Sequence, residues 1–171
     1  NREQSISILR QLAEVYKWWI DNKLGKSDLM SDASFITTGN KIITDCTNAY
    51  QRICEGINII ESDDIAFKAF SFMNTTMFLQ KALSEYSAKF GSGIPCKLRE
   101  FTDEENKPDN KKFDWRPFQI AFILLNIKGI ISGEDSDRDI VDLLYFPTGG
   151  GKTEAFLGSC VFAMFFDRLR G

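Results

Sequence analysis

Residues 145–154 read Y-F-P-T-G-G-G-K-T-E and include the residue types that bind a nucleoside triphosphate. The segment follows one apolar run and precedes another that has helical character. Consecutive glycines let a backbone turn its amides toward the β- and γ-phosphates, and the following helix adds the positive end of its dipole. The usual phosphate-loop pattern has glycine where this chain has Phe146, so the match is to the form P-T-G-x-G-K-T.

The residues of this loop have distinct expected roles. Lys152 is the candidate catalytic residue, because its ammonium group would reach the phosphates as a point charge. The hydroxyl of Thr153 is expected to bind the Mg²⁺ that accompanies ATP. Glu154 lies in the first turn of the next helix, where complementing the helix dipole is the favoured interpretation over a role in the site. The expected ATP-binding residues of the loop are Thr148, Gly149, Gly150, Gly151, Lys152 and Thr153.

Composition excludes several other kinds of chemistry. The 171 residues contain no histidine, and the four cysteines form no C-x-x-C pair, so common zinc sites and Ser-His or Cys-His catalysis are not expected. The net charge of −3 argues against a wholly basic nucleic-acid-binding module, although it leaves DNA binding by a local patch open. With no signal-peptide pattern and no apolar run of about 20 residues, we expect a cytoplasmic protein without a membrane contact.

The spacing of apolar residues predicts a helical N-terminal region. Apolar side chains recur at steps of three and four over residues 6–20 and again over residues 42–60. A third helix is expected over residues 65–89, with capping residues in the preceding Ser-Asp-Asp sequence at 62–64. Residues 21–40 are rich in polar residues and glycine, and we expect a loop with one short element at most.

Aromatic and sulfur-containing side chains in these helices have two possible roles each. Trp18 and Trp19 are candidates for stacking on bases, but burial in the core is the favoured interpretation. Met73 and Met77 could form an adaptable partner groove, although filling gaps in a core is the more common use of methionine. Because apolar side chains cover more than one face of the third helix, we expect it at the centre of a helical bundle.

A polar segment divides the chain into two expected domains. Residues 91–114 begin with Gly-Ser-Gly and are then dense in charged residues, which is typical of a linker. The chain is therefore expected to consist of a helical domain over residues 1–90, this linker, and a second unit over residues 115–171. In the second unit, Pro117 suits the first turn of a helix, residues 140–146 suit a short buried strand, and residues 152–168 suit a helix.

Two motifs in order resemble those of superfamily 2 helicases. The sequence Arg116-Pro117-Phe118-Gln119 precedes Lys152 by 33 positions, as counted from Gln119, and resembles the Q-motif that accompanies the phosphate loop in that family. The resemblance implies that Gln119 reads adenine, since its amide can both donate and accept a hydrogen bond. Without the loop downstream, Gln119 would be interpreted as an exposed helical residue.

A narrower resemblance covers most of the chain. Residues 46–80, 115–124 and 141–155 are similar to the large helicase of DISARM-type bacterial anti-phage defence systems. This likeness includes the helical region before the loop, which generic helicases do not share. It implies an ATP-driven protein that engages DNA, works with a partner protein of the same defence operon and contributes to restriction of phage DNA.

The resemblance also implies that the chain is an N-terminal fragment. We expect a mainly α-helical protein: an N-terminal helical bundle, then the truncated start of a RecA-like α/β motor domain with a Q-motif helix, one strand, the phosphate loop and one helix. The sequence contains no Asp-Glu box after the loop and no second lobe with an arginine finger, whose loss alone costs about 10³ to 10⁵ in rate. The fragment is therefore not expected to hydrolyse ATP efficiently, and residues 140–146 are expected to be poorly supported.

Two alternatives remain open at this point. The N-terminal helices could form a module that docks a partner or gates the path of DNA, attached to a nucleotide-binding switch. A non-hydrolytic switch of another phosphate-loop family is also compatible with the three glycines, although the Arg-Pro-Phe-Gln sequence disfavours it.

Overall fold

The structure is a computed structural model that describes residues 1–24, 33–90, 114–134 and 136–171. Within these ranges it consists of helices and connecting segments, without a strand. The prediction of a mainly helical protein is confirmed. The expected linker lies almost wholly outside the described residues.

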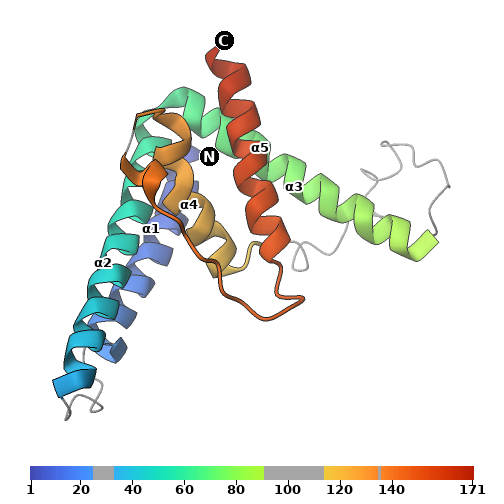
Figure 1. Cartoon of the computed structure of the whole chain (residues 1–171). Helices are drawn as coiled ribbons and strands as arrows, with labels where there is room; N and C mark the ends of the chain where they lie inside the picture. The colour runs from blue at the N-terminus through green and yellow to red at the C-terminus, as the bar shows by residue number, and fades with distance from the viewer. Residues whose placement is uncertain (25–32, 91–113, 135) are drawn as a thin grey trace.

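The first two long helices lie side by side (Figure 1). Helix α1, Arg2–Trp19, begins at Asn1, whose side chain accepts a hydrogen bond from the amide of Glu3. It continues into the π-helical turn η1, Ile20–Leu24. Helix α2, Ala33–Ser62, is longer than predicted and starts within the segment that was expected to be a loop.

The tryptophans of α1 are not core residues. Trp18 is 55% exposed and Trp19 is 41% exposed, so the interpretation that both are buried was wrong. The side of α1 that faces α2 instead carries Ile6, Leu9 and Ala13, which are all buried. A tryptophan on or beside an apolar stripe can stay at the surface because the described residues cover helix α1 on one side only.

Helix α3, Asp64–Phe90, begins where the sequence predicted a cap. The carboxylate of Asp63 accepts hydrogen bonds from the amides of Ile65 at 2.7 Å and Ala66 at 3.0 Å. Met73 and Met77 are buried, which confirms that they fill the core. The expected central position of α3 is wrong, however, because the second half of the helix extends beyond the other helices (Figure 1).

The central helix is α4, Pro117–Ile131, with Pro117 in its first turn as predicted. It packs against α2 on one side and against α5, Lys152–Arg170, on the other. Ile123, Leu124 and Ile127 of α4 are fully buried. One hydrophobic core contains residues of α1, α2, α3, α4 and α5, and the proposed boundary between two domains stays a prediction.

The segment that leads into the glycine-rich loop is extended but is not a strand. After the 3₁₀-helix η5, Ser136–Asp139, residues 140–147 form no ladder with another part of the described chain. Val141 is 94% exposed, Leu143 is 88% exposed and Tyr145 is 90% exposed. The prediction of a buried strand here is therefore wrong, since no neighbouring strand supplies the hydrogen bonds and cover that a strand needs. The expectation that this segment lacks the support of neighbouring strands is confirmed for the described part of the chain.

Candidate nucleotide-binding site

The glycine-rich loop turns sharply into helix α5. Gly149 and Gly151 have φ angles of 78° and 86°, which lie in the left-handed region that favours glycine. Gly151 is the N-cap residue of α5, and no side chain forms a capping hydrogen bond there. The first amides of a helix lack partners within the helix, so the start of α5 has donors available for an anion.

Gly150 is enclosed by the residues before it. Its amide donates to the carbonyl oxygen of Pro147 at 3.0 Å. A Cβ atom at Gly150 would lie 2.2 Å from the ring of Phe146, which itself stacks on Phe118 of α4 with 4.1 Å between the ring centroids. The aromatic stack thus holds the loop against α4, and only a glycine fits beneath it.

Gln119 connects the first turn of α4 to the loop. It is 5% exposed, so the alternative interpretation as an exposed helical residue is wrong. Its Oε1 accepts a hydrogen bond from the backbone amide of Arg116 at 2.8 Å, and its Nε2 donates to the carbonyl of Gly151 at 2.7 Å. These bonds use one N–H and one lone pair of the amide, which leaves one donor and one acceptor position for a ligand.

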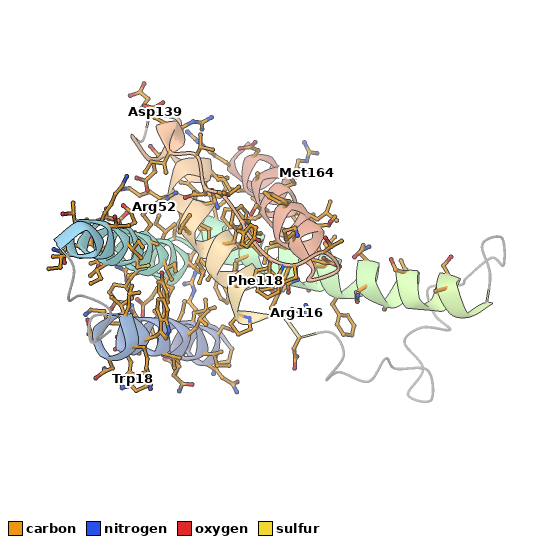
Figure 2. The ribbon with its side chains drawn as sticks, turned by 60° about the horizontal axis from the view of Figure 1, so that its bottom comes forward. Trp18, Arg52, Arg116, Phe118, Asp139 and Met164 are labelled. Atoms are coloured by element: carbon orange, nitrogen blue, oxygen red, sulfur yellow. The ribbon has the colours of Figure 1, made fainter. Side chains whose placement is uncertain are left out.

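Arg116 forms a second connection between α4 and the loop. Its guanidinium donates to the carbonyl of Gly150 at 2.7 Å. Arg116 is also the N-cap of α4, and Figure 2 shows its side chain at the start of that helix. Two adjacent carbonyls of the loop are therefore held by Arg116 and Gln119, so the two motifs that the sequence paired lie in direct contact.

Lys152 is bonded to the loop that precedes it. Its Nζ donates to the carbonyl of Phe146 and, at 3.3 Å, to that of Pro147. Thr148 and Thr153 are both exposed. The roles predicted for Lys152 in phosphate binding, for Thr153 in Mg²⁺ binding and for Gln119 in adenine recognition stay predictions.

A cavity of about 550 Å³ adjoins the loop. Gly149, Gly151 and Gln119 form one side of it, and residues of α3 form another. Glu154 also lines this cavity and lies in the first turn of α5, where its carboxylate is favourable for the helix dipole.

An ion cluster that sequence reasoning missed anchors the segment before the loop. Arg52 of α2 donates to both carboxylate oxygens of Asp142, at 2.8 and 2.9 Å, and to Asp137 at 3.1 Å. Burial by itself lowers the pKa of Arg52, but the two carboxylates outweigh it and raise the pKa above its ordinary value. The guanidinium therefore remains charged. The one available signal was the charge of Asp142 inside the apolar run at residues 140–146.

Other candidate chemistry finds no support in the described part of the chain. No group of histidine, cysteine or acidic residues there has the arrangement of a metal site. Cys46, Cys54 and Cys160 are free thiols. None of the described helices has the length and apolar character needed to cross a membrane.

These features define a helical protein in which a glycine-rich loop at a helix N-terminus is bonded to the helix before it. No family model matches the chain. Among curated proteins, DISARM protein DrmA of Bacillus paralicheniformis is 40% identical to it over 171 residues. The match covers 99% of this chain and 14% of the length of DrmA. The similarity to a DISARM protein that the sequence suggested is thus confirmed.

Proposed function

We propose that this chain is part of an ATP-dependent DNA helicase or translocase of a DISARM-type anti-phage defence system, and that it contains the first half of the ATP site. The observation that carries the proposal is the hydrogen bond from Gln119 to the carbonyl of Gly151 at 2.7 Å. It joins a candidate adenine reader to a candidate phosphate loop. The similarity to DISARM protein DrmA over 99% of the chain supports the assignment to this defence system.

The loop has the properties that a triphosphate requires. Because no side chain caps α5, the amides at its first turn would donate to phosphate oxygens. Lys152 now donates to the carbonyls of Phe146 and Pro147, and phosphate oxygens would replace these acceptors within reach of the same side chain. The exposed hydroxyl of Thr153 would hold Mg²⁺, which neutralises phosphate charge when bound.

Gln119 has the remaining hydrogen-bonding capacity that adenine needs. Its free N–H and free lone pair match an acceptor and a donor on the base, as in the bidentate pairing of glutamine with adenine N7 and N6. Guanine presents two acceptors at the same edge. A preference for ATP over GTP therefore follows from the orientation in which Arg116 and Gly151 hold this amide.

Residues 140–146 fit the first strand of a RecA-like sheet in the longer protein. Val141, Leu143 and Tyr145 are strongly exposed, while the side chain of Asp142 between them is 23% exposed and bonded to Arg52. This alternation has the period of a strand with one face held by the helices. Parallel sheets are covered on both faces, so additional strands and helices would bury the exposed apolar side chains.

The decisive experiment is DNA-stimulated ATP hydrolysis by the longer protein that contains this chain. Lys152→Ala should abolish the activity, and Gln119→Ala should raise KM for ATP more than KM for GTP. Lys68→Ala is a suitable control, because Lys68 is an exposed residue of α3. Unchanged ATPase activity in Lys152→Ala would contradict the assignment of the loop.

The exposed side of α1 favours a second function, the docking of a partner protein of the same defence operon. Ile8, Val15 and Trp18 are 58%, 67% and 55% exposed, and their spacing places them along one side of the helix. Val15→Lys combined with Trp18→Lys should then prevent copurification of that partner while ATP hydrolysis is retained. Retention of the partner by this double variant would exclude the α1 surface as its docking site.

A further inference from the structure

The cavity beside the loop has a wall that belongs to the N-terminal helices. Helix α3 ends at Phe90, far from the glycine-rich loop in the sequence, yet Thr75, Phe78 and Lys81 of α3 line the same cavity as Gly149 and Gly151. Figure 1 shows α3 crossing α5, against which it packs. The cavity volume of about 550 Å³ is within the range of small-molecule sites.

Asn74 fixes the position of this wall relative to α4. Its Oδ1 accepts a hydrogen bond from the indole Nε1 of Trp115 at 2.6 Å. Its Nδ2 donates to the carbonyl of Phe70 one turn earlier in α3, at 2.8 Å, which orients the amide. Trp115 directly precedes Arg116, so the residues that hold the loop carbonyls are tied to α3 through this indole.

The lining of the cavity suits the base and sugar of a nucleotide better than its phosphates. Met77 and Phe78 supply apolar surface against which a flat base can pack. Thr75, Gln80 and Lys81 supply hydroxyl, amide and ammonium groups on the same helix. Gln119 of α4 also lines the cavity, with one donor and one acceptor position left.

We propose that α3 forms one wall of the pocket for the base and ribose of a purine nucleoside triphosphate. The inference rests on the proposed function, since it extends the same site from the phosphate loop toward the N-terminal helices. It assigns to the helical region a direct part in nucleotide binding. A nucleotide that packs against α3 would also stabilise the contact between α3 and the first turn of α4.

The test compares ATP with inorganic tripolyphosphate, which occupies only the phosphate part of the site. Thr75→Trp places an indole in the cavity from an exposed position, so the fold should tolerate it. In calorimetric titration of the longer protein that contains this chain, this variant should bind ATP at least about tenfold more weakly and tripolyphosphate with unchanged affinity. Ser87→Trp is the matched control, because Ser87 is an exposed residue of α3 that does not line this cavity.

The outcomes separate this inference from the proposed function. Unchanged ATP affinity in Thr75→Trp, with circular dichroism showing a native helix content, overturns the assignment of α3 to the pocket. Lys152→Ala tests the loop independently, since it should weaken both ATP and tripolyphosphate. If Lys152→Ala loses binding of both ligands while Thr75→Trp binds ATP normally, the assignment of the loop stands and the assignment of α3 to the pocket wall is refuted. Failure of the unsubstituted longer protein to bind either ligand overturns both.

Discussion

Arg52→Met should destabilise the protein far more than removal of an exposed ion pair. The Arg52 and Asp137 side chains are only 12% and 13% exposed, and that of Asp142 is 23% exposed. The substitution removes three charge-assisted hydrogen bonds and takes the guanidinium away from the carboxylates of Asp137 and Asp142. Figure 2 shows Arg52 on α2, on the side of the helix that faces the segment after α4.

The expected loss of unfolding free energy is about 3 kcal/mol. Removing one partner of a buried pair costs about 3 to 5 kcal/mol, and the partial exposure of Asp142 places this cluster at the lower end. For a chain of this size the melting temperature should fall by about 6 to 12 °C. Urea unfolding followed by circular dichroism measures the free energy of unfolding, and hydrogen exchange of the Ile140 amide, which donates to the carbonyl of Asp137, reports release of the start of the segment before the loop.

Arg10→Met provides the matched control. Arg10 pairs with Glu61, but both side chains are 47% exposed, so the loss should be below about 1 kcal/mol. An equally small loss in Arg52→Met would refute the argument that burial makes the Arg52 cluster an anchor. Unchanged hydrogen exchange of the Ile140 amide would refute the role of the cluster in holding that segment.

The remaining predictions concern helix packing and alkaline pH. Gly56→Ala should lower the free energy of unfolding by about 1 to 3 kcal/mol, because a Cβ there would lie 2.1 Å from the carbonyl oxygen of Leu124. Gly133→Ala, with open space around it, should change that free energy by less than about 0.5 kcal/mol. Equal effects of the two substitutions in urea unfolding would contradict the close approach of α2 and α4. The hydrogen bond with Cys54, together with burial, raises the pKa of Tyr50 from 10.0 to about 12, so the folded state favours the neutral phenol. The stabilisation of the folded state by the neutral Tyr50 phenol should be complete below pH 10 and lost as the pH rises from 10 to 12. A Tyr50→Phe variant that loses stability as steeply over this range would count against this prediction.

Local signals in the sequence predicted most of the helices. The Ser-Asp-Asp cap before α3, Pro117 in the first turn of α4 and the buried Met73 and Met77 were each predicted from properties of short segments. The start of α2 was missed because residues 37–41, which follow its first turn, are polar residues and glycine. Local periodicity reports which side of a helix is apolar, but it does not report how many neighbours cover the helix.

Tertiary arrangement could not be read from the same signals. The central place of α4 rather than α3 depends on close approach at Gly56, which is a property of two helices together. Exposure of Trp18 similarly depends on the absence of a neighbour on the outer side of α1 in the described structure. That Gln119 and the glycine-rich loop belong to one site was expected only through the resemblance to a family, since 31 residues lie between Gln119 and Gly151 in the sequence.

The most direct test of the proposed site is the structure of this protein with a non-hydrolysable ATP analogue and Mg²⁺. The measurement is the position of the Lys152 Nζ atom. We predict that it leaves the carbonyls of Phe146 and Pro147 and lies within hydrogen-bonding distance of the β- or γ-phosphate, with the adenine beside Gln119. An analogue bound elsewhere, or Lys152 still bonded to the two carbonyls, would contradict the account.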